Sequence, residues 1–472
     1  MNQDIVFDLP LPPRSAWRDI TRRRFDVLVV GGGIHGAGVA RDAALRGFAT
    51  ALIERGDWAS GTSSRSSKLM HGGLRYLQYG AFGLVHESLV ERDRHLRLAP
   101  GGVHRLRFRV EAPGAAASLK MRAGIALYDL FTGGRSRGRV FAKQASYDDA
   151  RMDDARFCLA VVDDARRNGA ATLPYVRWLD WLRSGDAVAG ARVRDRFSGE
   201  EAEVHASVCV NAAGPWAGEV GGCVSGETPG LRLTRGSHVV LDRSPGEARL
   251  FFSPEDGRVL FLMPFDGETG LLGTTDLDAS GPDGEPVPTL EEVAYLRRAF
   301  DAAFPRWSGW RAVGVQCGLR PLVEGSGAPS AVSREERIVE DPVSGVVSIL
   351  GGKYTTYRAV AEDVVDRIAR RLRGRTGERP TRVRRLPVPP PAPDAVAALR
   401  RAFLSEDAVR LDDALLRRTS LGHRDAWTDS LGTAVEAMRR AHALPERAAQ
   451  AERERFCALQ TRRLAPLAAW RR

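Results

Sequence analysis

The sequence predicts an α/β protein with three parts: a Rossmann-like dinucleotide-binding domain, a substrate domain built on an antiparallel sheet, and a C-terminal helical cap. First, a short apolar run at 25–30 stops at a glycine cluster, and small and apolar residues then follow at helical spacing. Second, short apolar segments alternate with turns from 230 to 275, which favours an antiparallel sheet. Third, residues 394–472 are rich in Ala, Arg and Leu, with little strand signal, and predict helices.

The first elements form a βαβ unit. After a polar lead-in over 1–24, we expect a buried parallel strand at 25–30 and a helix over 34–46 that ends at Gly47. A second short strand at 49–53 ends at Glu54. The unit therefore has the length and order of a nucleotide-binding fold.

Less regular sequence follows. Residues 56–80 are rich in Gly, Ser and Thr without periodicity, which indicates a functional loop, and 84–98 predict a helix. Strands are expected at 204–210 and 346–350, the latter followed by a helix to about 373. The Arg- and Pro-rich stretch 374–393 predicts a linker. We expect a dinucleotide-binding domain from 20–100, 150–225 and 340–375, a substrate domain from 101–149 and 226–339, and a cap over 390–472.

Composition narrows the class of protein. The 472 residues are 43% hydrophobic and 27% charged, which disfavours a disordered or fibrous chain. With 66 Arg and four Lys against 59 acidic residues, the formal charge is +11. Such a charge fits nucleic acid, an anionic membrane surface or an anionic substrate, and a compositional Arg bias accounts for part of it. No nucleic-acid-binding motif accompanies it, so no nucleic-acid partner is predicted.

Cysteine usage and the N-terminus bear on location. The five cysteines are scattered without a CxxC pair, which argues against a disulfide framework or a metal site and favours a reducing compartment. The sequence contains no run of about 18 apolar residues, so no membrane-spanning helix is predicted. The first residues lack a signal-peptide pattern. We therefore expect a cytoplasmic protein without a metal.

The strongest local motif is GGGIHG at 31–36, which fits GxGxxG through Gly31, Gly33 and Gly36. The first glycine permits a tight turn, the second lets a pyrophosphate approach the backbone, and the third allows close helix–strand packing. Glu54, at the end of the next strand, is placed to accept the ribose hydroxyls of an adenine dinucleotide. There is one such motif, and the long polar segment at 61–80 could wrap a second ring system, which favours non-covalent FAD over NAD.

At this segment the sequence resembles a family. Region 26–54 together with TSSRSSKLMHGGLRYL resembles the FAD-dependent glycerol-3-phosphate dehydrogenases of the aerobic, quinone-reducing type. The resemblance covers about 20–373 continuously and returns weakly near the C-terminus. Further matching motifs follow in order: DDAR (153–156 or 163–166), NAAGPWA (211–217), RGSHVV (235–240), LGTTD (272–276), GLRPL (318–322), SREERI (333–338), GGKYTTYR (351–358) and DDALLRRT (412–419).

The resemblance implies a D-amino-acid-oxidase-like fold and oxidation of sn-glycerol 3-phosphate to dihydroxyacetone phosphate. A hydride would pass from C2 to N5 of FAD, and the electrons on to a quinone. Besides the glycine motif and Glu54, it implies a set of cofactor-binding residues: Thr62, Ser63, Ser64, Ser67, Lys68, Gly72, Gly73, Ala213, Gly214, Trp216, Gly352 and Thr355.

The substrate phosphate would need fixed cations. Arg75, Arg320 and Arg334 are the Arg residues within the matching motifs, and guanidinium groups suit phosphate geometry. Tyr76 could donate a hydrogen bond to the same phosphate, and Thr275 could line the substrate side.

The chemistry at C2 would also need a base and a cation near the flavin. Lys353, after two glycines at a helix start, could stabilise negative charge on the reduced flavin or the substrate oxygen. His71 and His238 are both candidate bases, and Arg320 could instead orient the hydroxyl. The sequence does not decide among these roles.

Several alternatives stay open. The same fold also serves amino-acid and amine oxidases such as glycine oxidase, although three Arg and a Lys are more cation than one carboxylate needs. The cap segment before 412–419 is shorter than in the family, which leaves open a flavin-binding protein without turnover. Residues 117–131 mix apolar and basic side chains, so they predict either a peripheral contact with the inner membrane surface or an ordinary packed helix. A homodimer is also left open.

Overall fold

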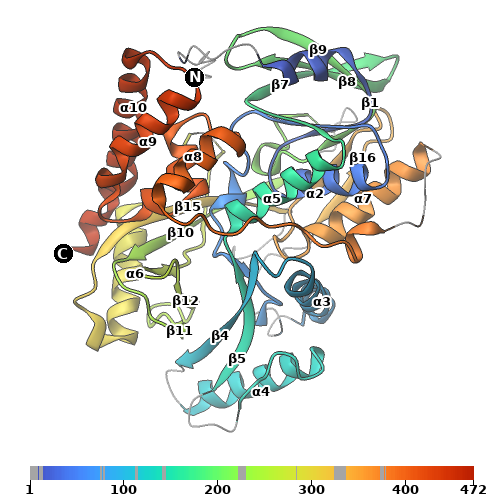
Figure 1. Ribbon diagram of the computed structural model, residues 1–472. Helices are drawn as coiled ribbons and strands as arrows, with labels where there is room; N and C mark the ends of the chain where they lie inside the picture. The colour runs from blue at the N-terminus through green and yellow to red at the C-terminus, as the bar shows by residue number, and fades with distance from the viewer. Residues whose placement is uncertain are drawn as a thin grey trace.

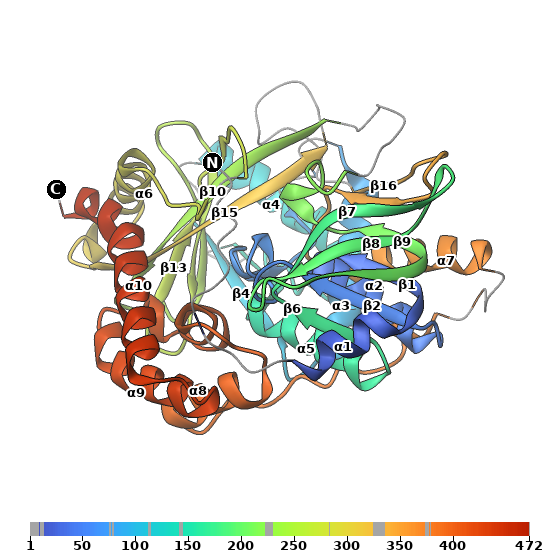
Figure 2. The ribbon, with the colours of Figure 1, turned by 90° about the horizontal axis from the view of Figure 1, so that it is seen from above.

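A computed structural model of the protein describes residues 9, 14–74, 77, 80–111, 115–140, 145–221, 230–282, 284–323, 336–372, 377 and 379–471. Within them lie two β-sheets, here called sheet A and sheet B, and a helical C-terminal cap. Figures 1 and 2 show the cap packed along one side of the molecule, beside both sheets.

Sheet A is the predicted nucleotide-binding sheet. Its strands run in the order β16-β17-β9-β1-β2-β6, and the hairpin β7–β8 joins at β9. β1 pairs in parallel with β2 and with β9, β17 is parallel to β9, and β16 is antiparallel to β17. The bounds are β1 Arg24–Val30, β2 Thr50–Glu54, β6 Ala171–Pro174, β7 Val176–Ser184, β8 Ala187–Asp195, β9 Glu201–Asn211, β16 Arg337–Glu340 and β17 Val347–Leu350.

Apolar, largely β-branched residues place sheet A in the core. Val27, Leu28 and Val29 of β1 are fully buried, as expected for a strand with both faces covered. Helices α2 (Ile34–Leu45), α5 (Asp154–Arg167) and α7 (Tyr357–Arg371) share one hydrophobic cluster with the sheet, and Figure 1 shows them side by side. α1 (Ser15–Arg22) belongs to a second cluster with β1 and β8. The predicted βαβ unit is confirmed.

Sheet B has the order β14-β10-β13-β12-β11-β4-β5-β3, with β15 also paired to β10. Its strands within the region predicted to be antiparallel do pair that way, whereas β4 runs parallel to β11. The bounds are β3 Leu69–Met70, β4 Val103–Glu111, β5 Ser146–Met152, β10 Leu231–Leu241, β11 Ala248–Phe252, β12 Val259–Pro264, β13 Gly270–Gly273, β14 Leu277–Asp278 and β15 Ala312–Val323.

Three helices flank sheet B. α3 (Phe82–Leu98) and α4 (Ala115–Phe131) share a hydrophobic cluster with β4 and β5, and α6 (Leu290–Ala303) packs against β10 to β13. The capping box of Thr289 and Glu292 starts α6. In Figure 1, α4 lies at the end of the molecule away from sheet A. The domain boundaries drawn from the sequence stay a prediction: by pairing, β3 belongs to sheet B and β16 to sheet A.

The cap has its own core of Leu, Ala, Phe and Met side chains, which also includes Leu9 and Tyr175. Its main helices are α8 (Ala395–Ser405), α9 (Trp427–Ala441) and α10 (Glu446–Leu464), and η7 (Asp413–Arg418) is a short π-helix. The remaining short helices are η1 Thr62–Ser64, η3 Gly214–Trp216, η4 Pro305–Trp307, η6 Pro380–Arg382, η8 Leu421–His423 and η9 Ala465–Trp470.

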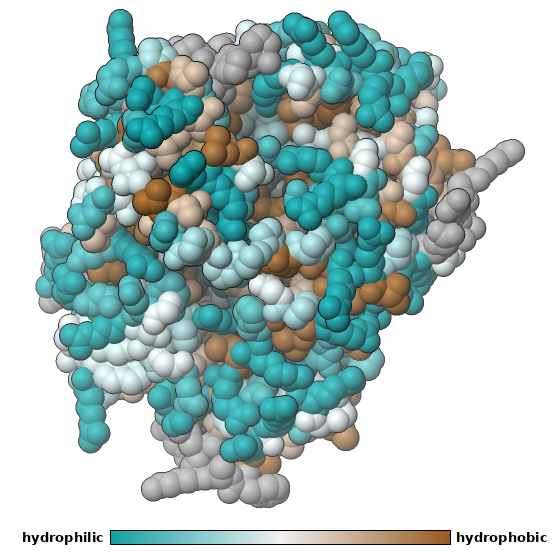
Figure 3. Space-filling view, viewed as in Figure 1, coloured by the Kyte–Doolittle hydropathy of each residue, from teal (hydrophilic) through white to brown (hydrophobic). Residues whose placement is uncertain are grey.

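The surface in Figure 3 is mostly hydrophilic, with small apolar patches. Among the residues that the structure describes, no helix is both long and apolar enough to cross a bilayer. In the same residues, no three His, Cys, Asp or Glu side chains gather as a metal site would require.

Candidate active site

A cavity of about 1220 Å³ connects the two sheets and the cap. Its lining includes Glu54, Tyr175 and cap residues, together with the turn after β1. Arg320 and apolar side chains of α4 and sheet B line it as well. Its position at the carboxyl ends of β1 and β2 is where open α/β sheets bind ligands.

The glycine turn after β1 shapes part of the cavity wall. Gly31 has φ +113°, and a Cβ there would lie 2.5 Å from the carbonyl oxygen of Ala212. A Cβ on Gly36 would overlap the carbonyl oxygen of Gly31. Gly33 caps α2, and the Ile34 N–H donates to Ser63 Oγ at 2.9 Å. The start of α2 thus faces the cavity with bare backbone, a cradle that fits a pyrophosphate.

Replacing Gly36 by Ala is expected to give protein purified without flavin, because the added methyl group must separate the first turn of α2 from the loop after β1. The flavin absorbance of the purified variant checks this. Gly432→Ala is the control, since Gly432 lies within α9, has no positive φ and has open space around it. Retention of flavin by Gly36→Ala would contradict the cradle.

Glu54 lies where the adenosine ribose of a dinucleotide is expected. Its carboxylate accepts the N–H of Gly32 at 2.7 Å and the N–H of Gly56 at 2.8 Å. Each oxygen keeps a lone pair for a ribose hydroxyl. Nearby, the Arg55 guanidinium lies 4.2 Å from the ring centroid of Trp216.

Most predicted cofactor residues line the cavity, and four do not. Those that do are Gly31, Gly33, Glu54, Thr62, Ser63, Ser67, Gly73, Ala213, Gly214, Trp216, Gly352 and Thr355. Gly36, Ser64, Lys68 and Gly72 are not in its lining. The Lys68 ammonium pairs with Asp154 at the start of α5, so its charge is directed into the protein.

The loop at 71–73 is held from behind. The Gly72 N–H donates to the Tyr128 hydroxyl at 2.9 Å, and this hydroxyl donates to Asp149 Oδ2 at 2.8 Å. Arg92 donates to Asp149 Oδ1 at 3.1 Å. Burial raises the pKa of Asp149 to about 6, against the opposing effects of Arg92 and Tyr128. All three side chains are buried, so the loop rests on a closed polar network.

Replacing Tyr128 by Phe is expected to lower the free energy of unfolding by about 1–3 kcal/mol, because a buried N–H and a buried carboxyl group lose their partner. Urea denaturation of the purified variant measures this. Tyr295→Phe is a suitable control, since that hydroxyl donates to Asp256 at an exposed position. Equal stability of Tyr128→Phe and the wild type would contradict the network.

Arg320 also lines the cavity. Its guanidinium donates to Thr274 Oγ1 at 2.7 Å and to the Thr275 carbonyl at 3.1 Å, and it pairs with Asp276 at 3.0 Å. Gly236 lies directly beneath, where a Cβ would collide with the guanidinium. The cation is therefore fixed in one orientation. Thr275 itself donates to Glu292 at 2.8 Å and is buried outside the cavity lining, which contains Thr274 instead.

The two candidate bases lie in different surroundings. His71 lines the cavity, and its backbone is tied to Thr355 Oγ1. His238 is 1% exposed, is absent from the lining and contacts Ser67 Oγ through Nε2 at 2.9 Å. Burial, with Arg320 and Lys68 nearby, lowers the pKa of His238 to about 3, so its imidazole is neutral.

Lys353 lies four residues before α7, rather than at the helix start that the sequence predicts. It is 9% exposed, lines the cavity and donates to Ser88 Oγ of α3 at 3.3 Å. Arg75, Tyr76 and Arg334, which were predicted to bind the phosphate, lie outside the described residues.

Comparison with known proteins places this geometry in a family. The family model described as FAD dependent oxidoreductase matches residues 26–367. The chain belongs to this family. The match spans both sheets and every predicted cofactor-binding residue, so the expected cofactor, FAD, is confirmed.

Relatives of this FAD-dependent oxidoreductase agree with the predicted resemblance. A glycerol-3-phosphate dehydrogenase of Mycobacterium leprae is 37% identical over 388 residues, 76% of this chain and 65% of the relative. An aerobic glycerol-3-phosphate dehydrogenase of Staphylococcus saprophyticus is 34% identical over 395 residues, 76% of this chain and 70% of the relative. The chain thus spans about two thirds of the length of the curated relatives it matches.

The fold extends the likeness to the cap. The X-ray structure of the glycerol-3-phosphate dehydrogenase from Bacillus halodurans, complexed with FAD, has a TM-score of 0.74 at 23% identity. The superposition covers 96% of this chain and 97% of the chain in that structure. The predicted fold class, a D-amino-acid-oxidase-like FAD-binding domain with a substrate sheet and a helical cap, is therefore confirmed.

The sequence reasoning missed part of this oxidoreductase's cavity wall. Cap side chains Arg410, Asp412, Arg417 and Arg455 line the cavity, as does Glu54. The motif DDALLRRT at 412–419 contains Asp412 and Arg417, and its resemblance to the family, far from any other matching motif, is the signal in the sequence that points to this wall.

Proposed function

We propose that the protein oxidises sn-glycerol 3-phosphate to dihydroxyacetone phosphate and passes the electrons to a quinone. The observation that carries the proposal is the orientation of Arg320, a partly buried cation held by three acceptors at the wall of an FAD-binding cavity. A cation fixed in advance can bind an anionic substrate or stabilise charge on its oxygen without reorganising. The names of the relatives support this substrate class.

The phosphate of the substrate needs more than one cation. Asp276 neutralises part of the Arg320 charge, so Arg320 is better suited to orient the C2 hydroxyl than to hold a dianion alone. We assign the phosphate to Arg75 and Arg334, with Tyr76 as a hydrogen-bond donor, on the sequence motifs that contain them. Bidentate guanidinium contacts suit its oxygens.

Oxidation at C2 removes one hydride and one proton. Bound FAD supplies the hydride acceptor at N5. His71 is the better candidate for the base, because it lines the cavity whereas the neutral His238 is buried behind Ser67. Lys353 brings a positive charge to the wall of the same cavity. There it would stabilise negative charge on the reduced flavin or on the substrate oxygen.

The electron acceptor would approach through the apolar part of the cavity. Side chains of α4 and of β11 and β12 give this part an apolar wall, which suits a lipophilic quinone: Met121, Leu127, Leu250, Phe252 and Phe261. On the outside of α4, Leu119 is 71% and Leu130 73% exposed. We propose that α4 touches the inner surface of the cytoplasmic membrane peripherally, so that a quinone can reach the cavity from the bilayer.

Anaerobic mixing of the purified yellow protein tests the substrate. Glycerol 3-phosphate is expected to bleach the flavin absorbance, whereas glycine should leave it unchanged. Bleaching by glycine alone would indicate an amine oxidase, and no bleaching by either compound would indicate a flavin-binding protein without turnover; both results contradict the proposal. Turnover with a soluble quinone analogue, compared with oxygen, then tests the acceptor.

A further inference from the structure

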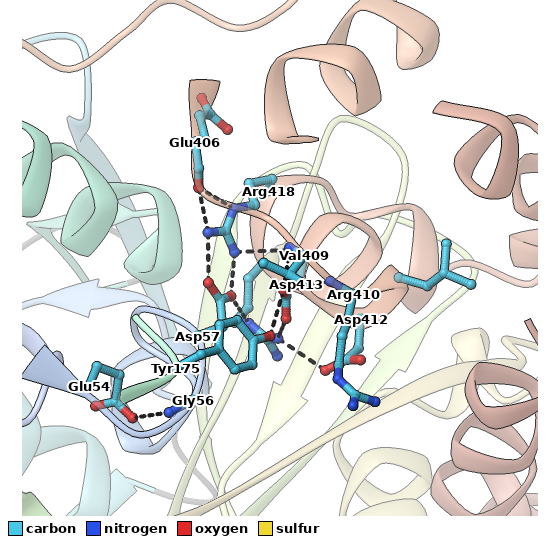
Figure 4. Close-up of polar contacts among 12 residues, drawn as sticks. Glu54, Gly56, Asp57, Tyr175, Glu406, Val409, Arg410, Asp412, Asp413 and Arg418 are labelled. Carbon is cyan, nitrogen blue, oxygen red and sulfur yellow. Dashed lines mark hydrogen bonds and ion pairs between the residues drawn. The ribbon is translucent and has the colours of Figure 1, made fainter. Parts of the chain in front are cut away.

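The cap is joined to the adenosine side of the cavity by a buried ion cluster (Figure 4). The centre is Asp57, three residues after Glu54. Arg418 donates to both carboxylate oxygens of Asp57, through Nη2 to Oδ1 at 2.7 Å and through Nη1 to Oδ2. Arg417 Nε donates to Oδ2 at 2.5 Å. Two consecutive arginines of η7 thus converge on one carboxylate of the nucleotide-binding domain.

A second carboxylate fixes η7 itself. Asp413 Oδ2 accepts the Tyr175 hydroxyl at 2.7 Å and the backbone N–H groups of Val409 and Arg410 at 2.8 Å each. Arg417 pairs with the other oxygen of Asp413. Burial raises the pKa of Asp413, and the nearby Asp57 carboxylate adds to this effect. The cluster therefore contains side chains of both the cap and the nucleotide-binding domain.

The cluster is almost dry. Asp57 is 1% exposed, Arg418 2% and Asp413 0%. Buried charges are tolerated where they are paired and hydrogen-bonded, and the removal of one partner leaves the other uncompensated. The position of Asp57 is therefore set by the cap.

The same cluster continues into the cofactor site. The Gly56 N–H donates to Glu54, and the Gly56 carbonyl accepts the N–H of Tyr175 at 2.9 Å. Asp57, Tyr175 and Arg417 line the cavity together with Glu54. The turn over 54–57 is thus held by Glu54 on one side and by the cap on the other. A shift of Asp57 would move the backbone that orients Glu54.

We propose that Asp57, Arg417 and Arg418 position the adenosine-binding turn, so that the cap controls how tightly the protein retains FAD. Asp57, Arg417 and Arg418 are positioning residues, since they act through Gly56 and Glu54. The inference rests on FAD as the cofactor and not on the proposed substrate. Its test uses no substrate, so its failure and that of the proposed function are distinguishable.

The test is the affinity of the full-length apoprotein of Arg418→Met for FAD, for ADP and for FMN. Partners that orient the ligands of a metal site typically contribute about 10–100-fold in affinity, and we take the same range for the partners of Glu54. We expect FAD, followed by quenching of its fluorescence, and ADP, followed as a competitor, to bind about 10–100-fold more weakly. FMN, which lacks the adenosine, should bind as it does to the wild type. Arg418→Lys keeps the positive charge but not the bidentate contact, so its affinity for FAD should lie between those of the wild type and Arg418→Met.

Arg463→Met is the matched control. Arg463 is also a buried cap arginine, but it donates to the Val315 carbonyl of β15 at 2.9 Å and so joins the cap to sheet B. We expect this variant to bind FAD and ADP like the wild type.

Three results would overturn the proposal. The first is unchanged FAD affinity in Arg418→Met, and the second is an equal loss for FMN, which indicates general destabilisation. The third is the same loss in Arg463→Met. If Arg418→Met does not fold, Arg418→Lys gives the decision, because a selective loss of FAD and ADP supports the proposal and an unselective loss contradicts it.

Discussion

Replacing Arg320 by methionine is expected to lower kcat/KM for glycerol 3-phosphate by about 10²–10³-fold, the usual loss when one preorganised donor at a reacting oxygen is removed. The guanidinium is oriented by Thr274, Thr275 and Asp276 before substrate arrives, so its removal takes away a preorganised donor. Steady-state rates with an artificial electron acceptor measure the effect. FAD content should not change, because Arg320 is not among the residues predicted to hold FAD.

Arg232→Met is the control for this variant. Arg232 lies on β10, which pairs with β15, the strand of Arg320. It forms an ion pair with Asp278 at 2.6 Å and is not in the cavity lining. Its replacement should leave kcat/KM unchanged. Full activity of Arg320→Met would exclude Arg320 from the proposed chemistry. Among the described residues, no other cation is predicted to orient the substrate hydroxyl.

Replacing His71 by glutamine is expected to lower kcat by about 10²–10⁴-fold, the range usual for loss of a general base. At high pH hydroxide can take the proton from the substrate in place of the base, so the loss should be largest below that pH. The dependence of kcat/KM on pH should then lose the limb that reports the base. His238→Gln is the matched variant. Because the pKa of His238 is about 3, this ring is neutral across the working range, and its removal should leave the shape of the pH profile unchanged.

The reverse result would exchange the two roles. If His238→Gln abolishes the pH-dependent limb and His71→Gln does not, the proton leaves through Ser67, which contacts His238 and lines the cavity. Anaerobic flavin reduction by substrate separates this step from reoxidation by the acceptor.

The sequence alone predicts the parts of the site that depend on local geometry. The glycines at 31, 33 and 36 could be assigned because a tight turn between a strand and a helix forces close backbone contacts within six residues. Glu54 could be assigned because β2 ends beside β1 in a parallel sheet. These relations follow from chain order and from the repeat of each element.

Side-chain direction is harder to predict. Thr274 and Thr275 are adjacent, yet their side chains have different partners, Arg320 for one and Glu292 for the other. A motif such as LGTTD does not say which one faces the cavity. The same holds for Lys68, whose positive charge is satisfied by Asp154, more than eighty residues away in the chain.

The cap was the least predictable part. Helices could be expected there from composition, but the partner of Arg417 and Arg418 is fixed only by tertiary packing. Neither residue periodicity nor charge pattern links η7 to Asp57, because ion pairs between distant segments leave no periodic trace in a single sequence.

The two ends of the Asp57–Arg418 pair are 361 residues apart in the chain. At the usual rate of ribosomal synthesis, about 5–20 residues per second, Arg418 is added about 20–70 s after Asp57. During that interval β9, β17 and α7 of the nucleotide-binding domain are added, and the wall that fixes the turn beside Glu54 comes after them. If the cap retains FAD as proposed, FAD that binds before η7 is added is free to leave again. Stable loading of the cofactor would then follow synthesis of the cap, and chains terminated before Arg418 would accumulate without flavin.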